Sequence, residues 1–301
     1  MSFIAWHPIF KHPLPEGHRF PMRKYELLHD RLLYKEIVEE EDFFSPEILD
    51  VKYLEGVHDK YYYQRLLDLK LSSSEIRRTG FPLSPQLVER ELRIAEGTIQ
   101  AAEAAMNYGV GFNVAGGTHH AGSNWGEGFC LLNDQAIAAH YLWKYSGIKK
   151  ILIIDLDVHQ GNGTADIFQN NSDILTFSMH GQNNFPFKKG KSDFDVGLPD
   201  GTEGTEYLHV LNKNLKHLSQ SVNPEFVFYQ AGADVLQTDK LGRLQLTKQD
   251  CRKRDRAVFD FCKKLEVPVQ VSMGGGYSEQ VSNIVDVHCQ TFKEGLPRLK
   301  L

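Results

Sequence analysis

The chain has 301 residues, which is enough for one large α/β domain or for two domains of ordinary size. Hydrophobic residues make up 41% of the chain, charged residues make up 24%, and the net charge is -5. These values are ordinary for a soluble globular protein, and they give no electrostatic reason to expect a nucleic acid or an anionic membrane as a partner. The function must therefore be sought in local groups of residues.

Short apolar runs rich in β-branched residues alternate with segments of helical periodicity. The predicted helices cover residues 85–106, 134–145, 204–219, 247–265 and 278–294. The predicted strands cover residues 151–155, 174–179, 226–232 and 267–276. Continuous apolar strands that alternate with helices are typical of the α/β class, with a doubly wound, mostly parallel sheet flanked by helices. Because no low-complexity linker, charge block or internal repeat interrupts the pattern, we expect residues 1–301 to form a single domain.

Two long segments lie outside this alternation, residues 109–134 and residues 180–204, and we expect both to be irregular loops. Long loops in a compact domain are usually functional or disordered, and the glycines, aromatic residues and histidines of these two favour function. Ligands bind beyond the carboxyl ends of strands in an open parallel sheet. Polar residues at strand ends are therefore the candidates for a site.

The four cysteines, at positions 130, 251, 262 and 289, form no C-x-x-C pair and no zinc-knuckle spacing. This pattern argues against a disulfide framework and against a cysteine-ligated structural metal. The first twenty residues lack a charged segment followed by an unbroken apolar run, and no run approaches the roughly 18 apolar residues of a membrane span. We therefore expect a cytoplasmic protein without a membrane span.

The strand ILIID ends in the first of three polar residues at alternate positions, Asp155, Asp157 and His159. If the extended geometry continues, these side chains share one face of the strand, so that two carboxylates and an imidazole form a plausible cation site. Acidic residues at strand-to-helix junctions are also common helix caps, and a capping role stays open for this motif alone.

A second signal is the segment GADVLQTDKLG at 232–242, where the carboxylate of Asp234 comes soon after the strand FVFYQ. Alone it is as compatible with capping as with metal binding. Together, Asp157, His159 and Asp234 supply one imidazole and two carboxylates and leave a fourth position open, which is typical of a catalytic zinc site and not of a closed structural one. The same ligand types do not exclude Fe²⁺, Mn²⁺ or Co²⁺.

Two further motifs carry groups suited to catalysis. The pair His119 and His120 lies in the glycine-rich segment GGTHHAG, where one imidazole can act as a base and the other can stabilise developing charge. Tyr277 follows the strand end MGGG, whose glycines allow the backbone to approach a ligand closely. An incidental surface pair of histidines and an ordinary buried tyrosine remain the competing interpretations of each motif alone.

In chain order, the motifs GGTHHAG, GFCLLND, DLDVHQGNGT, FSMH, YQAGADV and MGGGY resemble the signature of the zinc-dependent histone deacetylase superfamily, which has the arginase-deacetylase fold. The resemblance covers roughly the whole chain. The segments DLDVHQGNG, AGADVLQTDKLGRLQLT and LPEGHRFPMRKY are most similar to class IV deacetylases and their bacterial relatives.

The resemblance implies a role for each of these residues. Asp157, His159 and Asp234 would bind Zn²⁺, with Fe²⁺ as a possible substitute, and the open position would take water and the acyl carbonyl. His120 would be the general base and acid, and His119 its electrostatic partner. Tyr277 would donate a hydrogen bond to the carbonyl oxygen.

The resemblance also implies supporting residues around the metal. Asp155 would orient His119. A structural K⁺ or Na⁺ would be held by a set that includes two of the metal ligands, namely Asp155, Asp157, His159, Ser178 and Met179. A second monovalent site near Phe168, Asn171 and Ile174 is suggested only by spacing.

The substrate channel implied by the family would be lined by Gly128, Phe129, Phe185 and Gly275, with Phe187 as a rival to Phe185. Its aromatic walls would hold the aliphatic stem of an acyl-lysine-like substrate. One position departs from the common pattern: many family members carry an aspartate where this chain has Asn162. A neutral amide in contact with the catalytic imidazole would leave His120 less basic.

These features predict a zinc-dependent deacylase that acts on an acyl-lysine peptide or protein, without direct nucleic-acid binding. Acetylpolyamines or other small acylated amines are alternative substrates. An arginase-like ureohydrolase would need two metals, and the acid expected soon after His159 is absent, since Gln160, Gly161 and Asn162 follow. A non-catalytic acyl-lysine reader is the alternative from a different class. The oligomeric state is left open by the sequence.

Overall fold

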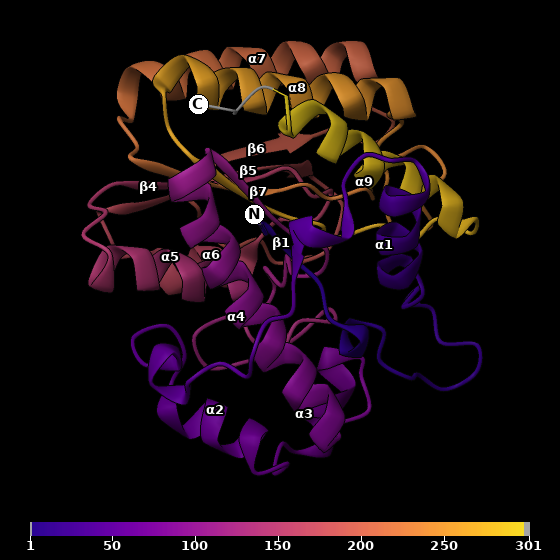
Figure 1. Ribbon diagram of the computed structural model, residues 1–301, viewed down its shortest axis with the longest axis vertical. Coiled ribbons are helices and arrows are strands. Elements are labelled where there is room, and N and C mark those ends of the chain that lie inside the picture. The colour runs from indigo at the N-terminus through magenta and orange to yellow at the C-terminus, as the bar shows by residue number, and fades with distance from the viewer. Residues whose placement is uncertain (1, 298–301) are drawn as a thin grey trace.

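Eight parallel strands form one sheet in the order β2-β1-β3-β8-β7-β4-β5-β6 in the computed structural model, which describes residues 2–297 (Figure 1). The predicted α/β class with a parallel sheet is confirmed. The strands are β1 (Ile4–Ala5), β2 (Phe43–Phe44), β3 (Val110–Asn113), β4 (Ile151–Asp155), β5 (Ile174–Gly181), β6 (Phe194–Leu198), β7 (Phe226–Gln230) and β8 (Val269–Ser272).

Helices cover both faces of this sheet, as a doubly wound fold requires. The helices are α1 (Lys24–Tyr34), α2 (Lys60–Leu67), α3 (Ser73–Thr79), α4 (Pro85–Tyr108), α5 (Asp134–Tyr145), α6 (Asn162–Phe168), α7 (Gly204–Ser221), α8 (Lys248–Leu265) and α9 (Val281–Gly295). Helices α7, α8 and α9 lie on one side of the sheet and α4 and α5 on the other (Figure 1). Short 3-10 helices occur at Pro8–Phe10, Glu40–Asp42 and Val51–Leu54.

The central strands are apolar throughout because both of their faces are covered. Every residue of β3, β4, β7 and β8 is buried. Strand β6 lies at the sheet edge, where the side chains of FDVGL alternate between more and less exposed positions. Burial on both faces therefore explains why the runs at 151–155 and 226–230 contain almost no polar residue before the strand ends.

Local sequence signals set the helix ends. Helix α4 begins after Ser84, whose hydroxyl accepts a hydrogen bond from the amide of Leu87, and it ends at Gly109, which has a φ of 85°. Helix α8 begins with a capping box in which Thr247 and Asp250 satisfy each other's free amides. These caps explain why the predicted helices at 85–106 and 247–265 end within two residues of the observed ones.

Both segments predicted as irregular loops contain a strand, and this part of the prediction is wrong. Strand β3 lies within residues 109–134 and β6 within residues 180–204. In β3, a Cβ atom at Gly111 would lie 1.9 Å from the carbonyl oxygen of Ala101 in α4, so the close approach of helix and strand requires glycine. A glycine in a four-residue strand weakens the β signal that a sequence offers.

The carboxyl ends of the four central strands are level. Asp155 at the end of β4 pairs in register with Gln230 of β7 on one side and with Ser178 of β5 on the other, and Gln230 pairs with Ser272 of β8. Three chain segments therefore leave the sheet side by side, after Asp155, Gln230 and Ser272. They carry the three predicted metal ligands and Tyr277.

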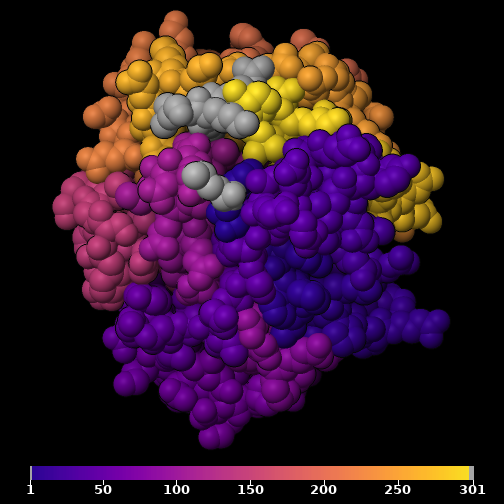
Figure 2. Space-filling view, viewed as in Figure 1, coloured from indigo at the N-terminus to yellow at the C-terminus, as the bar shows by residue number. Residues whose placement is uncertain are grey.

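The surface in the view of Figure 2 is divided by chain position: the N-terminal part of the chain covers its lower half, and the C-terminal helices form its upper edge. None of the helices within residues 2–297 has the length and apolarity to cross a membrane. The four cysteines are buried free thiols, as their spacing predicts.

Candidate active site

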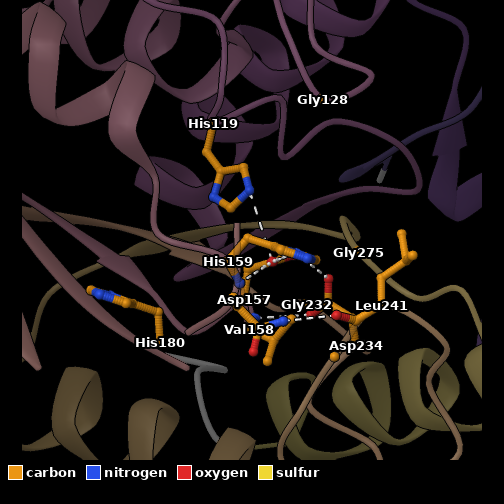
Figure 3. A network of polar contacts seen from close by, with 12 residues as sticks. His119, Gly128, Asp157, Val158, His159, His180, Gly232, Asp234, Leu241 and Gly275 are labelled. Atoms are coloured by element: carbon orange, nitrogen blue, oxygen red, sulfur yellow. Dashed lines mark hydrogen bonds and ion pairs between the residues drawn. The ribbon is translucent and has the colours of Figure 1, made fainter. Parts of the chain in front are cut away.

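The three predicted metal ligands meet at the carboxyl edge of the sheet. Asp157 and His159 follow β4, and Asp234 follows the neighbouring strand β7. One ligand atom from each of the three buried side chains lies within 4.8 Å of the others. His159 Nδ1 faces both carboxylates, at 3.0 Å from Asp157 Oδ1 and 3.2 Å from Asp234 Oδ2 (Figure 3).

This group fits a divalent metal ion. The buried Oδ2 atom of Asp234 has no well-oriented hydrogen-bond donor, although it faces an imidazole nitrogen. Burial opposes a charged imidazole, but the two carboxylates outweigh it and raise the pKa of His159 to about 10. The three side chains thus favour a positive charge between them. A bound metal ion would supply this charge in place of the second proton of the His159 imidazole. Among residues 2–297, no other group of three such side chains is found.

Backbone groups fix the orientation of both carboxylates. The amide of Val158 donates to Asp234 Oδ1 at 2.9 Å, and the amide of His159 donates to Asp157 Oδ1 at 2.9 Å (Figure 3). Gly275 closes the group from the β8 side, where a Cβ atom would lie 2.5 Å from Asp157 Oδ2 and 2.6 Å from Asp234 Oδ2. Only glycine fits at this position, which also has a φ of 60°.

The imidazole of His119 lies against the carboxylate of Asp155. Its Nδ1 atom donates to Asp155 Oδ2 at 2.7 Å, and its Nε2 atom lies 3.8 Å from Asp157 Oδ1. Burial disfavours the imidazolium, but the carboxylates of Asp155 and Asp157 reverse this effect and raise the pKa of His119 to about 9. His119 is therefore suited to carry positive charge and unsuited to act as a base near neutral pH.

His120 has the opposite environment. Burial lowers its pKa well below the ordinary value, and the neighbouring imidazoles of His119 and His159 lower it further. The Nδ1 atom of His120 donates to Asn162 Oδ1 at 2.7 Å, while Asn162 Nδ2 donates to Glu127 Oε1 at 2.6 Å. Because a carboxylate only accepts hydrogen bonds, Glu127 fixes the amide of Asn162, and Asn162 in turn keeps the proton on Nδ1. The Nε2 atom is left with a free lone pair.

Tyr277 lies on the same side of the sheet as the two histidines. Its ring centroid is 6.3 Å from that of His159 and 5.9 Å from that of Phe129. Burial raises its pKa well above the ordinary value, and the carboxylates of Asp234 and Asp157 add to this effect. The phenol therefore keeps its proton and can act as a hydrogen-bond donor.

A cavity of about 390 Å³ leads from these residues to the surface. Its inner part is lined by His120, His159 and Tyr277, and its walls include Gly128, Phe129, Phe185, Phe187 and Leu241. A Cβ atom at Gly128 would lie 2.8 Å from the ring of His120 and 3.3 Å from that of Phe185. The structure brings Gly128, Phe129 and Phe185 together here, whereas Phe187 is 87% exposed and stands further out. Gly275 lies instead in a second, smaller cavity, which is also lined by His119, Asp157 and Tyr277.

The predicted monovalent cation residues are close to each other but already bonded within the protein. Asp155 Oδ1 accepts the amide of Asp157 at 3.1 Å, and the hydroxyl of Ser178 lies 3.0 Å from His180 Nδ1. At the second suggested site, Asn171 Oδ1 accepts the amides of Asp173 and Ile174. Both ion sites stay predictions.

Three buried residues support the site without having been predicted from the sequence. Asp134 accepts hydrogen bonds from the amide and hydroxyl of Thr118, which anchors the histidine loop. Arg254 in α8 donates to the carbonyl oxygens of Gly232 and Leu156, and so holds the backbone of both metal-ligand segments.

Lys24 in α1 is the third of these residues, and it donates to the carbonyl oxygen of Gly275. Burial lowers its pKa to about 8 although nearby carboxylates oppose this effect. Asp134 and Lys24 belong to the motifs GFCLLND and LPEGHRFPMRKY, but no sequence signal indicates these contacts, because the partners are backbone groups or side chains distant in the chain.

Known proteins are similar to this chain in both sequence and fold. Residues 18–292 match the histone deacetylase domain. An uncharacterized protein of Picosynechococcus sp. is 42% identical over 285 residues, which cover 95% of each chain. Histone deacetylase 2 of Arabidopsis thaliana is 33% identical over 192 residues, which cover 63% of this chain and 50% of that protein. The chain thus aligns with about half the length of this plant deacetylase.

Two solved structures share the fold. A histone deacetylase homologue from Aquifex aeolicus has a TM-score of 0.81 at 22% identity, with 99% of this chain and 84% of that chain covered. A histone deacetylase homologue complexed with SAHA has a TM-score of 0.81 at 23% identity and the same coverage. These structures show the fold, and the domain match shows the family. The chain belongs to the histone deacetylase family.

Proposed function

We propose that this protein is a metal-dependent amidohydrolase that removes acetyl or longer acyl groups from lysine-like amines. The observation that carries the proposal is the convergence of a buried Asp157, His159 and Asp234 group, a neutral His120 and a protonated Tyr277 at the inner end of one cavity. A zinc ion bound by the three ligands would polarise an acyl carbonyl and make water nucleophilic near neutral pH. Fe²⁺ is chemically compatible with the same ligands.

Side chains of the protein supply the remaining catalytic roles. His120 Nε2 takes a proton from the attacking water and returns it to the leaving nitrogen, so that an amide and water become an amine and a carboxylate. Tyr277 donates a hydrogen bond to the acyl oxygen as it gains negative charge. His119, held positive by Asp155, stabilises the same charge. Phe129 and Phe185 enclose the aliphatic stem of the substrate.

The proposal also includes a structural monovalent ion, a single catalytic metal ion and a placement near class IV deacetylases. A K⁺ or Na⁺ ion near Asp155, Ser178 and Met179 would stabilise the strand ends from which the ligands project. The single group of three metal-binding side chains within residues 2–297 favours one catalytic metal over the two-metal site of a ureohydrolase. Placement near class IV deacetylases rests on sequence motifs alone.

The test is a panel of acetyl-lysine, short-chain and long-chain acyl-lysine peptides and acetylpolyamines, assayed with zinc-loaded protein. We expect release of free amine from at least one substrate, with kcat lowered by about 10²- to 10³-fold in Tyr277→Phe because one donor to the developing oxyanion is removed. Tyr34→Phe, at a residue that is 86% exposed, is the matched control. Turnover that is equal in wild type and Tyr277→Phe would contradict the mechanism, and binding of acyl peptides without any turnover would favour a reader.

A further inference from the structure

Three arginines from separate segments line the outer part of the active-site cavity. Arg19 precedes α1, Arg78 lies in α3, and Arg243 lies in the segment between β7 and α8. All three side chains are exposed, and the guanidinium of Arg19 lies 4.9 Å over the ring of Phe129, which forms the channel wall. The cations therefore stand where the channel opens to solvent.

Few carboxylates oppose these cations. Glu127 is the one acidic residue among those that line the cavity, and its carboxylate already accepts a hydrogen bond from Asn162. Arg243 lies 3.1 Å from Asp200, in a pair whose side chains are 52% and 41% exposed. Neither Arg19 nor Arg78 forms an ion pair with any residue in the described part of the chain. The mouth thus has an excess of positive charge although the whole chain has a net charge of -5.

The geometry of the channel determines which part of a substrate meets the arginines. If the acyl-amine stem lies between Phe129 and Phe185, as the proposed function requires, the rest of the amine substrate leaves the channel beside Arg19, Arg78 and Arg243. A guanidinium binds a carboxylate through paired N–H donors and repels a cation. The positions next to the acylated amine are therefore selected by charge.

We propose that this mouth selects acyl-lysine within an acidic peptide segment, whose carboxylates bind the three arginines. The inference rests on the proposed function and narrows its substrate class. It disfavours acetylpolyamines, because their remaining ammonium groups would lie among the guanidinium groups.

The test compares peptides that carry the same acyl-lysine flanked by glutamate, by glutamine or by lysine, all with amidated C-termini. A glutamine-flanked peptide with a free C-terminus is also included. Its kcat/KM shows how much of the preference a terminal carboxylate produces without any glutamate side chain. At low salt we expect kcat/KM for the glutamate peptide to exceed that of the glutamine peptide by about 3- to 10-fold, with the lysine peptide lowest. The ratio should approach one near 1 M salt, where the screening length is about 3 Å.

Arg78→Gln and Arg19→Gln should each lower the ratio of the glutamate to the glutamine peptide. Arg77→Gln is the matched control, because Arg77 is exposed in the same helix but does not line the cavity, and it should leave the ratio unchanged. Equal kcat/KM for all peptides, or an equal effect of Arg77→Gln, would overturn the inference and leave the proposed function intact.

The same peptides, carrying a fluorescent label, are also titrated with the protein. Fluorescence anisotropy then measures their binding affinities independently of turnover. Preferential binding of the glutamate peptide with no turnover of any peptide would overturn the proposed deacylase activity and retain the charge selection. Equal binding of all peptides would overturn the charge selection, whatever the turnover.

Discussion

Asn162 determines how the imidazole of His120 is held in this chain. Its amide joins His120 to Glu127 through hydrogen bonds of 2.7 and 2.6 Å, so the imidazole contacts a neutral amide, and that amide in turn contacts the carboxylate of Glu127. Burial and the two neighbouring imidazoles lower the pKa of His120, and an amide opposes them less than a carboxylate would. In the proposed mechanism His120 therefore acts as a neutral base that accepts a proton at a lower pH than the imidazole of a histidine–aspartate pair.

Asn162→Asp should raise the pKa of His120, because a carboxylate in contact with the imidazole stabilises its protonated form. The base works when it is neutral, so the acidic limb of the kcat/KM profile should move to higher pH. Asn170→Asp adds the same charge at an exposed position just beyond α6 and should leave the limb in place. An unchanged limb in Asn162→Asp would contradict the assignment of His120 as the base.

The loop after β8 packs its backbone against the candidate metal ligands. Gly275 has a φ of 60° and leaves no room for a Cβ atom beside Asp157 and Asp234, and Lys24 of α1 binds its carbonyl oxygen from behind. The loop thus fixes the ligands on one side and presents Tyr277 on the other.

Gly275→Ala should lower zinc affinity by about 10-fold or more, because the new methyl group displaces the two carboxylates and the backbone conformation is strained as well. Metal content after dialysis against a weak chelator measures this. Gly201→Ala is the control, since Gly201 has a φ of 79° but a Cβ atom there would meet nothing within 4 Å. An equal loss of zinc in both variants would assign the effect to backbone strain and not to the site.

The helices and strands differ in how well the sequence predicts them, because their local sequence signals differ in strength. Strand β4 and the helix at 134–145 have the predicted bounds, because buried apolar runs and amphipathic periodicity are strong local signals. The proximity of Asp157, His159 and Asp234 could be predicted because parallel strands bring their polar ends to one edge. The short edge strand β6 was missed although FDVGL alternates apolar residues with Asp195 and Gly197, because this signal is only five residues long and lies within a segment rich in glycine and polar residues.

The residues around the ligands are harder to predict, for a related reason. The sequence marks Asp134 only as the start of a helix, yet its carboxylate holds the histidine loop. Arg254 belongs to a helix whose polar residues are otherwise mostly exposed, and only the fold shows that this one is buried against the ligand segments. The residues of the candidate site could be found from local motifs, whereas the residues that support them depend on contacts between distant segments.

At the scale of the whole molecule, metal binding should contribute to stability. Without metal, buried Asp157, His159 and Asp234 keep charge in a desolvated position, and a ligand that binds only the folded state adds about 2.7 kcal/mol when its concentration is a hundred times Kd. Chelation should therefore lower Tm by roughly 5 °C or more, and added zinc should restore it. In Asp234→Asn the chelator should have little effect; an equal Tm decrease there would show that the metal binds elsewhere.

In the proposed mechanism, one metal ion bound by Asp157, His159 and Asp234 supports amide hydrolysis at the end of the channel. The most direct measurement is a titration of metal-free protein with zinc, in which bound metal and hydrolysis of an acyl-lysine peptide are followed together. Activity should rise in proportion to bound zinc and stop at one ion per chain, and Asp234→Asn should show neither tight binding nor turnover. Full activity in metal-free protein, or activity that needs a second ion, would contradict the account.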